Sequence, residues 1–260
     1  SGSASSIGVR AALPTLAAAL DNGAANLTEA VLTALPTPSP GPVFGGLRDG
    51  YAVLLDALVT DTDARVLRET SVGEIRRESG GWFVDRVGVV DGVVLAVPAP
   101  ILADLIADLA PDASRAAREI ELASSTVVAM AFPTSTELPQ NSGILVATDA
   151  GLDVKAFTLS SRKWPHLAQR DAVLLRASLG RFGDDTAAQR SDEDTIDVAL
   201  ADLSTVAGID TRPLAVTVQR WPGGLPQYAP GHLDRVAAIE SGVSELAGLA
   251  VTGAWQRGVG

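Results

Sequence analysis

Few side chains in this chain are of the types that carry out chemistry on their own. The sequence has two histidines, His166 and His232, and no cysteine. A zinc-type site needs several histidine or thiolate ligands close together, and a cysteine nucleophile needs a thiol. We therefore predict no metal site and assign no catalytic residue. We expect the two histidines to support the loops beside Pro165 and Gly231.

Motifs that hold phosphate or activate a nucleophile are also missing. In a G-x-G-x-x-G motif, glycines between a strand and a helix let backbone N–H groups approach a pyrophosphate. The segment GGLRDG at 45–50 has a different spacing and follows no expected strand. The sequence has no P-loop, no G-x-S-x-G and no H-E-x-x-H. These motifs therefore indicate neither a nucleotide site nor a hydrolase.

The composition is that of an acidic globular protein. The 260 residues carry a net charge of −11 and are 47% hydrophobic, but only 4% aromatic. Nucleic-acid binding needs clustered Lys and Arg, so we exclude a nucleic-acid partner. Because thiols are absent, a cytoplasmic location is the default. Prolines and aspartates interrupt the longest apolar stretch, from Gly92 to Ala110, before the roughly 20 residues that a membrane helix needs.

Apolar residues recur at helical spacing in the first part of the chain, which predicts several helices there. Two short helices are expected at 9–20 and 26–35, the second with Asn26 as its N-cap. The proline-rich stretch 36–42 reads as a linker. After it, apolar residues from Leu47 to Leu58 recur at helical spacing, which predicts an amphipathic helix.

Alternation with a period of two then indicates strands. Four short candidates cover 65–97, and GVVLAV at 92–97 is apolar throughout, as expected of a strand buried on both faces. A helix is expected directly after it, with Pro100 in its first turn. A second group of strands is expected within 126–179, followed by a helix at 192–207 between Ser191 and Gly208. An alternating strand at 213–221, a helix at 233–246 and a strand at 249–253 complete the chain.

Several local patterns together resemble one family. They are IGVRAALPTL (7–16), FGGLRDGYAVLLDALV (44–59), SRKWPH (161–166), LLRASLGRFGDD (174–185), RWPGGLPQYAPGH (220–232) and VTGAWQRGVG (251–260). In this order they resemble the protoporphyrinogen and coproporphyrinogen oxidases of haem biosynthesis, in the form typical of Gram-positive bacteria. That family belongs to the flavin-dependent amine-oxidase-type proteins. The likeness spans the whole chain, and the conjunction of its last two motifs is more specific than either alone.

The resemblance implies a fold, a cofactor and a substrate. The expected fold class is α/β of mixed α+β character, with a substrate-binding domain of mixed sheet and helices plus C-terminal segments of a Rossmann-like FAD domain. The implied cofactor is FAD, the substrate a porphyrinogen, and the electron acceptor molecular oxygen. The family's N-terminal βαβ unit with its glycine fingerprint is lacking, so we expect the middle and C-terminal part of a longer enzyme, inactive alone.

The same resemblance implies a domain organisation. Residues 1–42 would be a helical part of the substrate domain with the linker, and 43–100 a segment of the FAD domain. Residues 101–235 would form the substrate-binding domain, and 236–260 the C-terminal segment of the FAD domain.

Site residues are carried over from the family by position. Val72 would contact the adenosine side of FAD, Trp221 would lie near the isoalloxazine ring, and backbone would approach the cofactor at Gly258, Val259 and Gly260. A porphyrinogen is an apolar macrocycle with carboxylate arms, so it needs an apolar cavity with cations at its rim. Arg162 and Lys163 form a compact positive pair, and Phe157 lies on the probable strand before them. These three residues are the expected substrate contacts.

Other readings of the sequence stay open at this point. Another flavin oxidoreductase of the same fold, such as an amine oxidase or a carotenoid desaturase, is one alternative, and a non-enzymatic binding domain is another. The sequence does not decide between the two porphyrinogens. It also does not decide the oligomeric state, or whether the helices around 101–122 make peripheral contact with a membrane.

Overall fold

A computed structural model describes residues 6–36, 41 and 45–258, and the chain divides into two compact units. We call the described parts of 1–8, 119–232 and 254–260 the sheet unit, and those of 9–118 and 233–253 the second unit. The helices at 99–118 therefore group with the second unit, whereas the expected boundary lay at residue 100. The division into cofactor and substrate domains stays a prediction.

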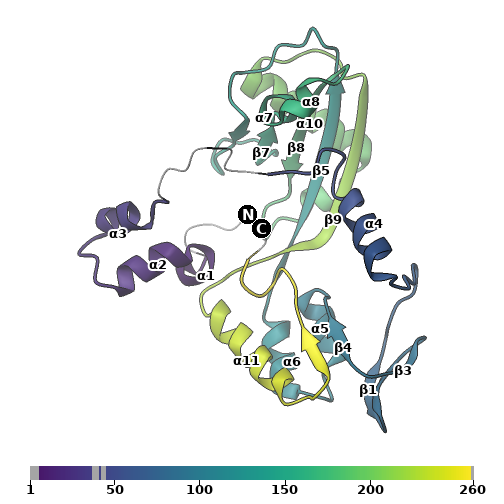
Figure 1. Ribbon diagram of the computed structural model, residues 1–260. Coiled ribbons are helices and arrows are strands. Elements are labelled where there is room, and N and C mark those ends of the chain that lie inside the picture. The colour runs from purple at the N-terminus through teal and green to yellow at the C-terminus, as the bar shows by residue number, and fades with distance from the viewer. Residues whose placement is uncertain (1–5, 37–40, 42–44, 259–260) are drawn as a thin grey trace. The chain divides into compact units, whose positions relative to one another are not determined.

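The sheet unit is built on five antiparallel strands in the order β6-β7-β8-β5-β9 (Figure 1). Their bounds are β5 Leu122–Phe132, β6 Gly143–Leu145, β7 Ala156–Thr158, β8 Val173–Leu179 and β9 Ala215–Pro226. The long β5 lies between β8 and β9, and its alternating small and branched residues suit a strand that pairs on both edges. Strands β6, β7 and β8 fall within the segments where the sequence predicts strands, whereas β5 begins four residues before its predicted segment and β9 continues five residues past its own.

One face of this sheet is closed by helices, and the core lies there. Alternate residues of β5, namely Val128, Met130 and Phe132, are buried against α10 (Asp192–Ala207). The helix has the predicted punctuation. The Ser191 side chain accepts a hydrogen bond from the Asp194 N–H, and Gly208 adopts the left-handed conformation at the C-cap. Shorter helices complete the unit: α7 Ser160–Lys163, α8 Pro165–Ala168 and α9 Thr186–Gln189.

The second unit contains a parallel pair of strands, β4 (Val93–Leu95) and β10 (Leu249–Val251). Strand β4 leads into α5 (Ala99–Leu105), which packs on α6 (Pro111–Arg118). Helix α11 (His232–Ser244) approaches α6 closely at Gly242, where an added Cβ would meet the Ala113 Cβ at 2.9 Å. Small residues at this crossing therefore let the two helices come together.

A separate three-stranded antiparallel sheet contains β1 (Ile75–Glu78), β2 (Gly81–Val84) and β3 (Gly88–Val90). Trp82 connects this sheet to the loop before β10. Its side chain is fully buried, and its indole N–H donates to the Ala247 carbonyl at 3.1 Å. The Arg77 guanidinium lies 4.9 Å from the centre of the same ring and donates to the same carbonyl at 2.6 Å. A buried indole with a satisfied N–H is a strong anchor for a small sheet.

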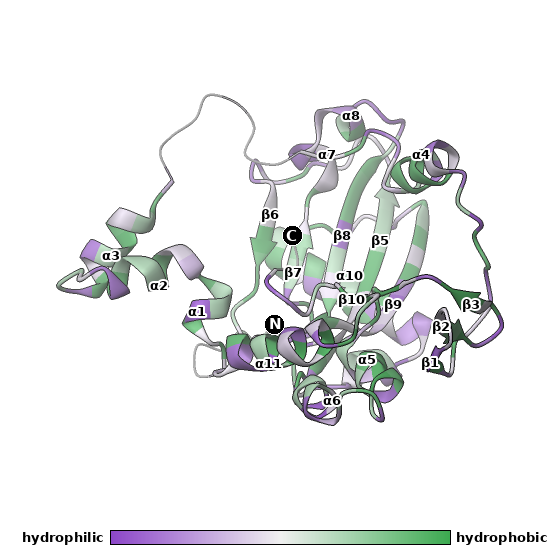
Figure 2. Cartoon of the chain, turned by 60° about the horizontal axis from the view of Figure 1, so that its bottom comes forward, coloured by the Kyte–Doolittle hydropathy of each residue, from purple (hydrophilic) through white to green (hydrophobic). Residues whose placement is uncertain are grey.

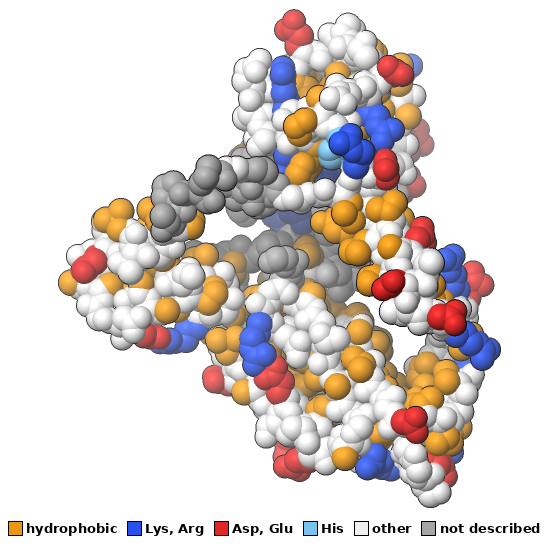
Figure 3. Space-filling model, in the orientation of Figure 1, with side chains coloured by type: hydrophobic (Ala, Val, Ile, Leu, Met, Phe, Trp, Pro, Cys, Tyr) orange, Lys and Arg blue, Asp and Glu red, His pale blue; other side chains and the backbone are white. Residues whose placement is uncertain are grey.

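Four more helices belong to the second unit: α1 Val9–Ala12, α2 Pro14–Asp21, α3 Leu27–Ala34 and α4 Ala52–Thr62. Helices α2 and α3 pack together, and the Asn26 side chain caps α3 by accepting from the Glu29 N–H at 3.0 Å, as the sequence predicts. No residue of α4 is buried, and its hydrophobic side chains show on the surface in Figure 3.

Two predictions about strands were wrong. Residues 65–70 form no strand, because Glu69 takes a positive φ that turns the chain. The apolar segment 92–97 is not buried on both faces, since the Val94 side chain is 66% exposed beside a single neighbouring strand. Among the described residues, none of the helices has the length and apolar character needed to cross a membrane.

Candidate functional site

The face of the five-stranded sheet away from α10 carries the candidate site (Figure 2). We call it the open face. Because side chains alternate along a strand, residues between the core positions point to this face, and the register aligns them across strands. Val127 lies between Ser178 and Gln219, and Ala129 between Arg176 and Thr217. The register assigns to the open face Ser125, Val127, Ala129, Ala131, Gly143, Leu145, Ala156, Thr158, Leu174, Arg176, Ser178, Ala215, Thr217, Gln219 and Trp221.

The charge of the open face is opposite to that of the chain. The sequence has 31 acidic and 20 basic residues, yet the open-face residues include Arg176 and no Asp or Glu. Arg176 is exposed in the middle of β8, opposite Ala129 and Thr158. A cation among small and apolar side chains suits a ligand that is largely apolar and carries negative groups.

A second cation reaches the same sheet from Lys155, which directly precedes β7. Its ammonium donates to the Gly180 carbonyl at 2.6 Å and to the Ser125 hydroxyl at 3.3 Å, where β8 ends and β5 begins. Partial burial lowers the pKa of Lys155, and the nearby Arg181 guanidinium lowers it further. The cost of burying this charge is therefore not balanced by a neighbouring carboxylate.

Arg181 follows Gly180 and adds a third positive group to this end of the sheet. One terminal nitrogen of its guanidinium, Nη2, is buried without a hydrogen-bond partner. Asp184 compensates part of the charge. Hydrogen bonds from Thr186 are the main reason that the pKa of Asp184 is lowered, with smaller contributions from Arg190 and Arg181. Lys155 and Arg181 thus both place positive charge near the end of β8, with Asp184 close by.

Trp221 lies on the open face at the same end of the sheet. It pairs with Ser125 in the β5–β9 register, and its side chain is 56% exposed. Exposure of an indole beside polar groups is typical of a surface that receives a flat apolar partner. Trp221 therefore pairs with the same residue, Ser125, whose hydroxyl accepts from the Lys155 ammonium.

The motif LPQYAPGH closes onto the C-terminal segment within the sheet unit. The Tyr228 hydroxyl donates to the Ala254 carbonyl. Nε2 of the buried His232 lies 3.1 Å from the Gln256 carbonyl, so this nitrogen carries the proton in that contact. The two rings stack with their centres 4.2 Å apart. Burial raises the pKa of Tyr228, while a hydrogen bond with the Gly258 backbone opposes the rise. His232 thus supports a loop, as the sequence predicts.

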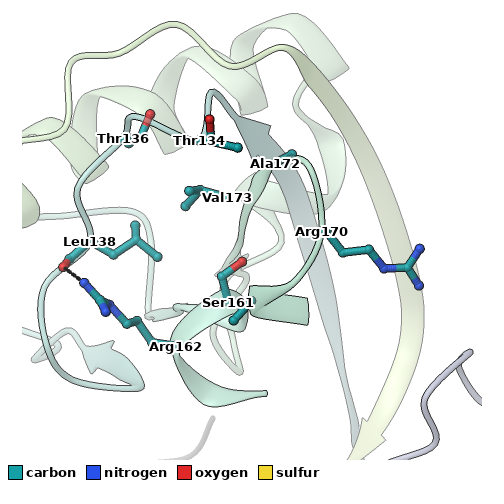
Figure 4. A pocket seen from close by; sticks show the side chains of 9 residues that line it. Thr134, Thr136, Leu138, Ser161, Arg162, Arg170, Ala172 and Val173 are labelled. Carbon is teal, nitrogen blue, oxygen red and sulfur yellow. Dashed lines mark hydrogen bonds between the residues drawn. The ribbon is translucent and has the colours of Figure 1, made fainter. Parts of the chain in front are cut away.

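Arg162 lies in a different place, a cavity of about 250 Å³ (Figure 4). Its guanidinium donates to the Leu138 carbonyl at 3.0 Å, whereas the Arg170 side chain points away from the cavity. Val173 of the lining pairs with Phe132, and Leu179 at the other end of β8 pairs with Thr126. The six residue steps from Val173 to Leu179 place Arg162 roughly 20 Å along the strand from the Trp221 end.

The remaining predicted site residues are dispersed. The Phe157 ring is 1% exposed in the core under the sheet, so it supports β7 and does not line a surface. Lys163 is half-buried, with its ammonium 5.4 Å from the centre of the Trp164 ring. Val72 is half-buried in an irregular segment before β1. Gly258 is exposed, and Val259 and Gly260 lie outside the described residues. The part of the chain that is described contains no cluster of three or more potential metal-ligating His, Cys, Asp or Glu.

Comparison with known proteins supports a flavoprotein origin. The family described as flavin-containing amine oxidoreductase matches residues 9–259. The coproporphyrinogen III oxidase of Mycobacterium leprae is 46% identical over 262 residues, which cover 100% of this chain and 57% of that protein. That of Mycobacterium tuberculosis H37Rv is 48% identical over 265 residues, with coverages of 100% and 56%. The chain therefore spans about half the length of the curated relatives it matches.

Solved structures agree at the level of the fold. A protein of Exiguobacterium sp. 255-15, assigned as a protoporphyrinogen oxidase, superposes with a TM-score of 0.82 and 29% identity over 98% of this chain and 56% of that one. Cyclohexylamine oxidase from Brevibacterium oxydans IH-35A superposes with a TM-score of 0.61 and 15% identity, covering 80% of this chain and 48% of that chain. The second likeness shows a shared fold alone. The predicted mixed α/β fold class is confirmed.

Proposed function

Because the chain belongs to the family of flavin-containing amine oxidoreductases, we propose that it is part of an FAD-dependent oxidase acting on coproporphyrinogen III. The product would be coproporphyrin III, with molecular oxygen as the final electron acceptor. The observation that carries this proposal is the 46% identity, over the whole chain, to a protein named coproporphyrinogen III oxidase. The open face, apolar with cations and without carboxylates, supports the same class of substrate.

The described residues fit an approach of FAD in two respects. A Cβ built at Gly258 would meet nothing within 4 Å, so backbone there is accessible to a flat ring or a phosphate. Trp221 offers an exposed flat surface on the open face. We propose that Trp221 and the terminal segment Gly258, Val259 and Gly260 lie beside the cofactor, and that Val72 contacts its adenosine side.

The chemistry that FAD would supply when bound is redox chemistry: electron pairs would pass from the substrate to the flavin and from there to oxygen. The protein contributes binding and exclusion of water. The apolar side chains Val127, Ala129 and Ala131 form a floor that favours an apolar macrocycle over water. Trp221 at the edge of that floor can contact a pyrrole ring in an offset-stacked or edge-to-face arrangement. Tyr228 and His232 hold the backbone of the terminal segment in one position.

The proposed reaction balances with oxygen as co-substrate. A porphyrinogen loses three pairs of hydrogens, as electrons and protons, when it becomes a porphyrin. Each pair reduces one molecule of oxygen to hydrogen peroxide. We place this reaction in the cytoplasm, the default location for a sequence without cysteine.

The test uses the full-length gene product that contains this chain, purified and supplied with FAD. We expect oxidation of coproporphyrinogen III faster than of protoporphyrinogen IX, measured by porphyrin fluorescence together with oxygen uptake. Hydrogen peroxide should form in proportion to the oxygen consumed. A full-length protein that oxidises neither porphyrinogen would overturn the proposal, whether it oxidises an amine instead or shows no oxidase activity. A protein that binds no flavin would overturn it as well.

A further inference from the structure

We propose that Arg176 and Lys155 hold two carboxylate arms of a flat substrate that lies on the open face. The inference rests on the proposed function and assigns a specific site to the negative groups of its substrate. It replaces the expected role of Arg162 and Lys163, which the sequence favours because they are adjacent. The occupant is an apolar macrocycle with at least two carboxylates.

Charge complementarity supports the site first. Within the described residues, neither Arg176 nor Lys155 forms an ion pair, although the chain carries more acidic than basic residues. By contrast, Arg190 and Arg220, which point to the helix side, pair with Asp153 and Asp192. Arg176 and Lys155 are thus among the cations that have no carboxylate partner within the described residues and can bind an anion from outside.

The spacing of the two cations suits a ligand that spans the sheet. Arg176 lies in β8, and Gly180, whose carbonyl accepts from Lys155, directly follows the strand four residues later, so the two backbone positions are at most about 13 Å apart. Between them, Ser178 on β8 has a small side chain, and the residue opposite it on β5 is the apolar Val127. Such a floor admits a flat ring with a negative group at each end.

The width of the face fits the same ligand. Leu145 at the β6 edge is 90% exposed, and Trp221 at the β9 edge is 56% exposed. Four strand spacings separate these edges, or about 19 Å. Large apolar side chains at both edges and small ones between them make a shallow seat for a macrocycle.

The environment of Lys155 points to binding and not to stability. Partial burial and the Arg181 guanidinium lower the pKa of Lys155 in the folded state. The charged lysine therefore destabilises the folded protein at any pH below this lowered pKa. The destabilisation disappears as the pH rises to 10.5, the ordinary pKa of a lysine in the unfolded chain. A bound carboxylate would offset the cost. A group kept for binding at the expense of stability is a recurrent feature of functional sites.

The experiment compares Arg176→Gln and Lys155→Met with Arg115→Gln, an exposed cation on α6 that pairs with Asp112. In the full-length gene product, we expect either site variant to raise KM for coproporphyrinogen III roughly 10- to 100-fold with a smaller change in kcat, as loss of a charged hydrogen bond predicts. Arg115→Gln should match the wild type. Affinity for coproporphyrin III should fall equally, whereas affinity for its tetramethyl ester should not change.

Stability separates binding from a structural role. Arg176 is exposed, so Arg176→Gln should fold as the wild type does. Lys155→Met should unfold at an equal or higher urea concentration than the wild type when no ligand is present. Normal KM and porphyrin affinity in both site variants would overturn the inference, as would a raised KM in Arg162→Gln alone. If the wild type oxidises no porphyrinogen at all, the proposed function fails instead.

Discussion

At the scale of single residues, Tyr228 and His232 decide the path of the C-terminal segment. Both belong to the motif at 220–232 that carries the resemblance, and both bind carbonyls in the other motif, at Ala254 and Gln256. Two motifs that are separate in sequence are thus one structural feature. The position of His232 is accounted for by its contact with the Gln256 carbonyl.

Replacing Tyr228 by phenylalanine keeps the stacked ring and removes the hydroxyl. We expect Tyr228→Phe to lower the free energy of unfolding by about 1 kcal/mol near neutral pH, because the Ala254 carbonyl loses its donor. Urea unfolding followed by tryptophan fluorescence measures this change. Tyr51→Phe is the matched control, since Tyr51 is 69% exposed, and it should have no effect.

The pH dependence of the same variant has a definite sign. Burial raises the pKa of Tyr228 above the ordinary value of 10.0, so the folded state favours the neutral phenol. The stability that the neutral Tyr228 phenol contributes is complete below pH 10.0 and is lost as the pH rises past that value. The wild type should therefore lose stability above pH 10 more steeply than Tyr228→Phe. Parallel curves for the two proteins would contradict this assignment.

At the scale of elements, the end of β8 is shaped by a glycine. Gly180 has a φ of +86°, and an added Cβ would lie 2.8 Å from the Ser124 carbonyl oxygen. The same residue offers its own carbonyl to Lys155. The close approach of β5 and β8 and the position of the ammonium therefore depend on one position without a side chain.

Gly180→Ala and Gly183→Ala form a matched pair. Gly183 has a similar φ of +81°, but a Cβ there would meet nothing within 4 Å. We expect Gly183→Ala to cost about 1 kcal/mol from backbone strain alone. Gly180→Ala should cost roughly 2–4 kcal/mol, because the clash with Ser124 must also be relieved. Chemical denaturation of both variants tests this, and equal losses would show that the close approach is unimportant.

At the scale of the whole molecule, each compact unit is assembled from separate segments of the chain. The sheet unit takes residues from three stretches and the second unit from two. The chain also spans about half the length of its curated relatives. A cofactor as large as FAD binds through several segments at once, and the glycine fingerprint that usually holds its pyrophosphate is not in this sequence.

We therefore expect the 260-residue chain to retain FAD much more weakly than the full-length gene product. After gel filtration with added FAD, the full-length protein should keep a yellow chromophore and the shorter chain should lose it. Circular dichroism of the shorter chain serves as the control for folding. A shorter chain that retains stoichiometric flavin and oxidises a porphyrinogen would show the expectation to be wrong.

Much of the element pattern could be predicted because its signals are local. Asn26 caps α3, Ser191 and Gly208 bound α10, and alternation identifies β9. Site prediction used adjacency in the sequence as a guide: Arg162 and Lys163 stood out as neighbours, and their role stays a prediction. Arg176 is a single cation in an apolar strand, and only the structure shows that its side chain is exposed.

What the sequence by itself determined is the set of elements, the family and the acidic, cysteine-free character of the protein, since propensity, capping and motif spacing act over a few residues. Only the tertiary structure decided that Trp221 pairs with Ser125 and that the Lys155 ammonium reaches Gly180. Register between distant strands depends on long-range packing, and a shift by one residue would move every side chain to the opposite face.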